Sequence, residues 1–157
     1  GSIENRARLM LEAVDAAVAV WGPDRVGLHI APRGTSHSMG DSNPLATFGH
    51  VAREVGRRKI AFLFARENLG PGRIGPQLKQ AFGGPFIAND KLTFESASQL
   101  LAAGEADAAA WGVAFIANPD LPRRFAEKAP LNPPDTSTFY AIGAKGYTDY
   151  PALPKAG

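Results

Sequence analysis

The chain has 157 residues, of which 45% are hydrophobic and 20% are charged, and its formal net charge is +2. These values are typical of a single globular domain. Two short basic clusters, at 57–59 and 123–124, carry no interleaved aromatic residues, which argues against a nucleic-acid-binding protein. Because cysteine is absent, disulfides, a thiol nucleophile and Cys-ligated metal sites are excluded.

The sequence also lacks an apolar run long enough to cross a bilayer and the pattern of a secretory leader. We therefore expect a cytoplasmic protein without membrane contacts. The three histidines, His29, His37 and His50, lie too far apart for a metal site, and the acidic residues show no metal-ligand spacing. No metal is expected.

Apolar residues recur at helical spacing in some segments and form short continuous runs in others, so helices and strands alternate. In chain order we expect a helix over 2–21, a strand over 26–30, a helix from Pro44, a strand over 60–64, a short helix after the 70–75 loop, a strand over 86–88, a helix capped by Thr93, a strand over 108–111 and a helix over 121–128.

Strand–helix alternation with short apolar strands predicts an α/β fold with a parallel sheet. Four such units are half of a TIM (β/α)8 barrel, which needs roughly 250 residues and eight strands. Half a barrel leaves two strand edges unpaired and one sheet face uncovered. Three explanations are open: another polypeptide supplies the other strands, residues are missing from the sequence, or half-barrels dimerise.

The stretch 110–121 is the strongest candidate for a ligand-binding turn. A strand is expected to end at Gly112 and to turn at once into a short helix. A glycine lets the backbone approach a ligand, and free N–H groups at a helix start favour phosphate. The alternative is a glycine needed only for helix–sheet packing. Asn118, Pro119 and Asp120 are expected to cap the next helix.

Five separated motifs resemble the Old Yellow Enzyme family, which includes N-ethylmaleimide reductase-like proteins. They are Gly1 to Arg8 (Gly-Ser-Ile-Glu-Asn-Arg-Ala-Arg), Phe115 to Leu121, Pro130-Leu-Asn132, Phe139-Tyr140 and Gly146 to Pro151. The family's members are FMN-dependent ene-reductases built as TIM barrels. The resemblance implies that residues 1–157 are the C-terminal half, strands 5–8 with their flanking helices, and that the N-terminal half is absent from this chain and is its partner.

The resemblance also implies a reaction. Family members transfer a hydride from NAD(P)H through FMN to the activated C=C bond of an α,β-unsaturated carbonyl compound, such as an enone or a maleimide. Their proton donor and substrate-binding residues belong to the N-terminal half, so no catalytic residue is expected in this chain. Its implied share is the FMN phosphate site. The alternative is a non-catalytic scaffold or oligomerisation module that has lost flavin binding.

By the same resemblance, backbone N–H groups of two turns would hold the FMN phosphate. One turn is Asn89-Asp90-Lys91 and the other is Gly112-Val113. The family usually has an arginine at the position of Val113, so a charged phosphate contact is lost here. Lys91 can replace that charge as a point cation, although it can equally be a solvated loop lysine.

Three further residues complete the expected site. His29 stands where the family usually has an arginine at the flavin's pyrimidine edge, and Arg33 just beyond that strand can substitute for it. His29 can instead be an ordinary buried, hydrogen-bonded histidine. Tyr140 is placed near the substrate by the resemblance, with a packing aromatic as the alternative.

Overall fold

The computed structural model describes residues 1–34 and 39–154, which form two units, Gly1–Ala110 and Trp111–Gly157. His37 lies outside the described residues. Within them, no helix combines the length and apolarity needed to cross a membrane.

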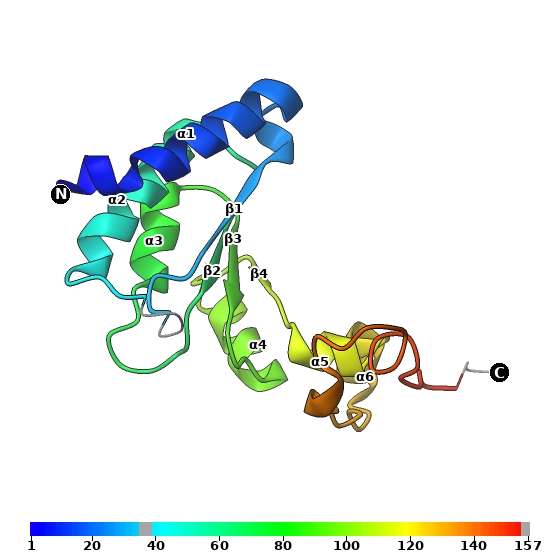
Figure 1. Ribbon diagram of the computed structural model, residues 1–157. Coiled ribbons are helices and arrows are strands. Elements are labelled where there is room, and N and C mark those ends of the chain that lie inside the picture. The colour runs from blue at the N-terminus through cyan, green and yellow to red at the C-terminus, as the bar shows by residue number, and fades with distance from the viewer. Residues whose placement is uncertain (35–38, 155–157) are drawn as a thin grey trace. The chain divides into compact units, whose positions relative to one another are not determined.

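The first unit is built on a four-stranded parallel sheet with strand order β1-β2-β3-β4. Helices α1, α2 and α3 lie together on one side of the strands (Figure 1). Its elements are α1 (Ile3–Trp21), a 3-10 turn (Pro23–Arg25), β1 (Gly27–Ile30), α2 (Pro44–Arg57), β2 (Phe62–Arg66), α3 (Gly75–Phe82), β3 (Phe86–Asn89), α4 (Phe94–Ala102) and β4 (Ala108–Ala109). The parallel α/β sheet agrees with the sequence prediction.

Side-chain caps fix the starts of three helices. The Ser2 hydroxyl accepts the Asn5 N–H at α1, and the Asn43 side chain accepts the Ala46 N–H at α2. At α4, Thr93 and Ser96 form a reciprocal capping box. Each cap satisfies backbone donors that have no partner inside the helix.

The strand pairing divides the sheet into two faces. Paired residues in neighbouring strands point to the same side, so Leu63 shares a face with Phe86, and Ala65 shares it with Ile30. All four are at most 3% exposed. We call this the covered face, and it is the hydrophobic core of the unit.

The opposite face carries the row His29–Phe64–Ile87 and, one step nearer the carboxyl ends of the strands, the pair Arg66–Asn89. These side chains are half-buried or exposed. We call it the open face. Its aromatic and aliphatic residues are those of a surface that needs cover, which agrees with the predicted uncovered face of a half-barrel.

Helices α2 and α3 approach closely because α2 has a glycine at the contact. A Cβ added to Gly56 would lie 2.3 Å from the carbonyl oxygen of Phe82. Around this contact Val51, Val55 and Leu78 are at most 1% exposed. The α2–α3 pair is therefore held by backbone approach as well as by side-chain packing.

The second unit contains α5 (Val113–Ala117), α6 (Leu121–Glu127) and a 3-10 turn at Thr136–Thr138. Two asparagines connect its segments. Asn118, which is 1% exposed, accepts the Asn132 N–H at 2.7 Å, and the Asn132 side chain donates to Ala117 O and Pro151 O, both at 2.8 Å. These contacts bind the proline-rich tail to the short helices.

An ion pair completes the attachment of the tail. The Arg124 guanidinium donates to the Asp120 carboxylate at 2.7 Å and to the carbonyl oxygens of Pro130 and Pro151 at 2.6 and 2.8 Å. The other Asp120 oxygen accepts the Leu153 N–H at 2.7 Å. Asp120 stands at the N-cap position of α6 but makes no capping hydrogen bond. The expected cap position is thus found at Asp120, but its carboxylate binds Arg124 and the tail instead of the helix N–H groups.

Acidification is expected to weaken this attachment. The N–H of Leu153, followed by the Arg124 guanidinium, lowers the pKa of Asp120 below its ordinary value of 3.8. A carboxylate with a lowered folded-state pKa stabilises the fold above its unfolded pKa, and this contribution is lost as pH falls through the folded-state pKa. Proteolysis of the 150–154 segment should accelerate below about pH 4. Asp120→Asn, which cannot titrate, should show no such acceleration, and an identical pH profile in both proteins would contradict the assignment.

Candidate functional site

The first part of the candidate site is the turn that follows β3. Asn89 ends that strand, and its side-chain amide donates to Ala110 O at 2.7 Å, while its carbonyl oxygen accepts the Glu67 N–H at 2.9 Å. Both contacts hold the strand end between its neighbours. Asn89 is therefore a residue that fixes where the turn begins.

The next two residues adopt a backbone conformation that is rare outside glycine. Asp90 has φ 101° and Lys91 has φ 54°, and such conformations cost of order 1–3 kcal/mol each. Within residues 1–34 and 39–154, neither backbone N–H donates to a protein acceptor. The Lys91 side chain is exposed and has no ion-pair partner among the described residues. The turn thus presents two free amides and one free ammonium group.

A residue that the sequence did not single out stands beside this turn. Arg66 ends β2, pairs with Asn89 in register, and places its Nε 3.7 Å from the Asp90 carboxylate. Its side chain is 53% exposed. The alternation of side chains along a strand could have indicated Arg66. Phe62, Phe64 and Arg66 lie on one face of β2, which ends two residues later than expected.

His29 lies in the middle of β1 on the open face. Its ring contacts Phe64 edge-on, with centroids 4.3 Å apart. It is exposed and makes no hydrogen bond to another described residue. Partial desolvation, and then the positive charge of Arg66, lower the pKa of His29 below 6.5. At neutral pH it is an uncharged imidazole that can donate one N–H.

Arg33 is engaged by a loop. Its guanidinium donates to Pro71 O at 2.8 Å and lies 3.8 Å from the Glu67 carboxylate. Glu67 is 8% exposed and accepts the N–H groups of Ile74 and Gly75 at 2.9 and 2.7 Å. Arg33 and Glu67 together organise the connection from β2 to α3. The role of Arg33 at the flavin stays a prediction.

The second unit carries the other expected residues. Gly112 precedes α5 with φ −94°, and a Cβ there would meet no protein atom within 4 Å. Neither backbone conformation nor packing among the described residues therefore requires glycine at this position. The N–H groups of Val113 and Ala114 have no acceptor among the described residues, and Val113 is 49% exposed.

Tyr140 also lies in the second unit, in the tail. It has φ 63°, its side chain is 97% exposed, and its backbone N–H donates to the Tyr147 hydroxyl at 2.8 Å. Within this unit its ring is not a packing aromatic. Its expected place near a substrate stays a prediction.

Unit 1 brings His29, Arg66 and the Asn89–Lys91 turn to the open face and the carboxyl ends of adjacent strands. Among the described residues, no group of three His, Asp or Glu side chains could hold a metal. The chemistry available is anion binding by backbone amides and cations, and hydrogen bonding by a neutral imidazole.

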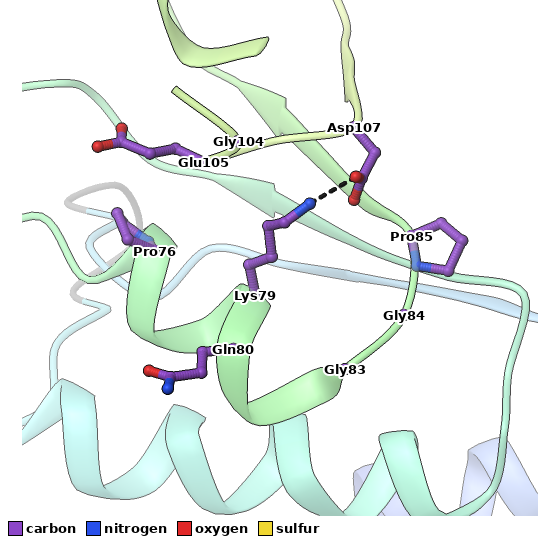
Figure 2. Close-up of a pocket in the computed structure, with 9 residues that line it drawn as sticks. All are labelled: Pro76, Lys79, Gln80, Gly83, Gly84, Pro85, Gly104, Glu105 and Asp107. Atoms are coloured by element: carbon purple, nitrogen blue, oxygen red, sulfur yellow. Dashed lines mark ion pairs between the residues drawn. The ribbon is translucent and has the colours of Figure 1, made fainter. Parts of the chain in front are cut away.

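A separate hollow lies at the amino ends of β3 and β4, and Figure 2 shows Lys79 and Asp107 meeting across it. Lys79 Nζ is 2.5 Å from Asp107, whose other oxygen accepts the Phe86 N–H at 2.8 Å. Lys79, and then that N–H, lower the pKa of Asp107. Because these charges are engaged in structural contacts, and none of the expected site residues lines the hollow, it is not the candidate site.

Comparisons with known proteins identify the family of this chain. Residues 1–132 match the NADH:flavin oxidoreductase / NADH oxidase family. The chain belongs to this family. Old Yellow Enzymes are among the solved structures it resembles, as the five sequence motifs predict.

Two curated relatives illustrate the likeness. A probable flavin mononucleotide-dependent alkene reductase of Leishmania infantum is 36% identical over 156 residues, which cover 98% of this chain and 43% of the relative. 12-Oxophytodienoate reductase 2 of Arabidopsis thaliana is 38% identical with the same coverage. The chain spans about 43% of the length of these relatives.

Solved structures extend the likeness to the fold. Morphinone reductase in complex with tetrahydroNAD superposes with a TM-score of 0.93 at 44% identity, over 99% of this chain and 43% of that one. The Old Yellow Enzyme homologue from Zymomonas mobilis gives 0.92 at 38% identity, over 98% and 45%. The predicted fold class, a partial barrel of the Old Yellow Enzyme type, is confirmed.

Proposed function

We propose that this chain is part of an FMN-dependent ene-reductase that transfers a hydride from NAD(P)H, through FMN, to the activated C=C bond of an α,β-unsaturated carbonyl compound. The observation that carries the proposal is the alignment of 98% of the chain with a protein named as a probable flavin mononucleotide-dependent alkene reductase. The tetrahydroNAD complex of morphinone reductase supports a nicotinamide reductant. An enone or a maleimide is the proposed substrate class.

The residues present fit an FMN phosphate. Free N–H groups at Asp90 and Lys91 suit an anion, and the Lys91 ammonium group adds a positive charge. The Val113 and Ala114 N–H groups are a second set of donors. They follow Gly112, where neither the backbone conformation nor the packing of the described residues requires a glycine. We propose that the Asp90–Lys91 turn holds the phosphate, and the Gly112–Val113 turn stays a predicted phosphate-binding turn of the second unit.

The share of this chain in the reaction is binding and orientation. FMN, when bound, supplies the hydride chemistry. The amides of the Asp90–Lys91 turn and the Lys91 side chain would hold the phosphate, and neutral His29 would donate one hydrogen bond toward the pyrimidine edge. No proton donor to the substrate is proposed in this chain, with Tyr140 serving as a substrate contact only.

We propose that residues 1–157 are the C-terminal half of the barrel, strands 5–8, and that an N-terminal half completes it. The support lies in the two outer strands, since each of β1 and β4 pairs with a single neighbour among the described residues. The open face, with Phe62 and Phe64 half-buried, is where the interior of a completed barrel would pack.

A flavin titration of the completed barrel tests the proposal. FMN should bind at micromolar concentration, with quenching of flavin fluorescence, while riboflavin, which lacks the phosphate, should bind more weakly. Lys91→Ala should raise the FMN dissociation constant by about tenfold, as expected for one charge-assisted contact. Absence of FMN uptake by the wild type would contradict the proposal.

The second candidate function is a scaffold or oligomerisation module without flavin. Val113 and His29 favour it, because neither provides the positive charge of the arginine usual at its position. Only the first function predicts FMN binding in the titration above. They also differ in activity, since only the first predicts NAD(P)H oxidation that depends on a maleimide or an enone.

A further inference from the structure

We propose that Arg66 provides the principal side-chain charge for the FMN phosphate, which Val113 cannot supply. This inference rests on the proposed function and deepens it. It assigns the role to a residue on β2, between the strand that carries His29 and the strand that ends at the Asn89–Lys91 turn.

Arg66 is the strand-borne cation nearest to the free amides. Its register partner is Asn89, the residue that directly precedes the turn, and its Nε lies 3.7 Å from the Asp90 carboxylate. The two free N–H groups belong to Asp90 and Lys91. A guanidinium group and two amides beside each other can bind an oxyanion from several directions.

The hydrogen-bonding capacity of Arg66 is unused by the described residues. A guanidinium carries five N–H donors, yet Arg66 donates no hydrogen bond to any of them, and 3.7 Å is too long for one to Asp90. Arg33, in contrast, donates to Pro71 O. Arg124 uses three donors in the second unit.

The effect of Arg66 on His29 supports this position. The positive charge of Arg66 helps to lower the pKa of His29, so its field reaches across the open face to β1. Arg66 therefore adds to the desolvation that lowers the pKa of His29. On this part of the sheet the fixed positive charge comes from Arg66 and not from the histidine.

Asp90 sets the strength of the site. Its carboxylate belongs to the turn and lies 3.7 Å from the guanidinium, so it would repel an incoming phosphate and compete for Arg66. Arg66, Asp90 and Lys91 together carry a net charge of +1, from two cations and one anion. Removing the Asp90 charge should therefore tighten phosphate binding.

The test compares two arginines in the completed flavoprotein. Arg66→Gln should raise the FMN dissociation constant by about 10- to 100-fold, the loss expected for a charged contact, and should change riboflavin binding by less than about threefold. Arg73→Gln removes the same charge from an arginine paired with Glu105 at 2.6 Å and should leave both constants within about twofold. Equal losses for FMN and riboflavin, or equal effects of the two variants, would overturn the inference.

The Asp90→Asn variant distinguishes a phosphate-binding role of Arg66 from a role in holding the turn in place. If Arg66 binds phosphate, this variant tightens FMN binding several-fold, since asparagine tolerates the left-handed backbone and repels no anion. If Arg66 only holds the turn through Asp90, the variant weakens FMN as Arg66→Gln does, and the inference fails. Arg66→Lys should recover part of the lost affinity, because the charge is kept without the planar group.

The outcomes distinguish this inference from the proposed function. Wild-type protein that binds no FMN contradicts the proposed function. Wild-type protein that binds FMN, together with an Arg66→Gln variant of unchanged affinity and unchanged melting temperature, contradicts the role of Arg66 and leaves the function intact.

Discussion

Gly56→Ala is expected to lower the free energy of unfolding of the first unit by about 3 kcal/mol, the upper range for overpacking a core. The added Cβ would lie 2.3 Å from the carbonyl oxygen of Phe82 and 3.1 Å from its carbonyl carbon. These are backbone atoms that no rotamer change can move, so α2 and α3 must separate. The separation would open the contact around Val51 and Leu78, which are at most 1% exposed. Urea denaturation followed by circular dichroism measures the loss.

Gly49→Ala in the same helix is the matched control. A Cβ there would meet only the Arg53 side chain, at an ordinary 3.6 Å. Since alanine is a better helix former than glycine, this variant should gain up to about 1 kcal/mol. The two substitutions are chemically identical, and opposite signs would show that the α2–α3 approach is the cause. A loss shared by both variants would contradict this explanation.

Arg124→Ala is the other change with a large expected effect. Arg124 is 4% exposed and binds Asp120 and two carbonyl oxygens. Its removal leaves Pro130 O without its donor and takes one of two donors from the Asp120 carboxylate and from Pro151 O, which keep Leu153 N–H and Asn132. Loss of a charged hydrogen-bonding group of this kind costs about 1.5–3 kcal/mol. The tail from Pro130 to Pro151 should detach, and limited proteolysis should cut it much faster than in the wild type.

Arg123→Ala tests whether any arginine of α6 would have this effect. Arg123 is 37% exposed, pairs with Glu127 and donates to the tail only near its end, to Pro154 O at 2.9 Å and to Leu153 O at 3.5 Å. Exposed pairs contribute up to about 1 kcal/mol and a hydrogen bond about as much, so the segment from Pro130 to Pro151 should stay attached. Arg124→Lys should be intermediate, because one ammonium cannot reproduce three directed bonds. Rapid cleavage of the Arg123→Ala tail would contradict the special role of Arg124.

Much of the fold could be predicted because local signals were strong. Alternating helical and apolar segments gave the parallel sheet, and the Thr93 cap and the Pro44 start are found as expected. Strand ends were less predictable. β2 runs from Phe62 to Arg66, whereas residues 60–64 were expected, because an apolar run does not show which of its residues meet a neighbouring strand.

The position of the candidate turn in the sheet was predictable from the sequence, but its backbone conformation and its neighbouring side chains were not. The turn after β3 follows from the topology, since the carboxyl ends of parallel strands meet at one edge of a sheet. Its left-handed conformation was not predictable, because Asp90 and Lys91 stand where glycine would be the ordinary signal. Arg66 and the loop contacts of Arg33 depend on register and on distant carbonyl oxygens, which one sequence does not specify.

The order of the sheet has a consequence for how the first unit folds. Each strand pairs only with the next strand along the chain, so every pairing closes a comparatively short loop. Parallel pairings form slowly, because the chain entropy of each helical crossover is lost before the pairing is gained, and pairing only with the next strand keeps that loss as small as a parallel sheet allows. The first unit can therefore assemble strand by strand, with β1 and β4 left as the edges to which later partners add.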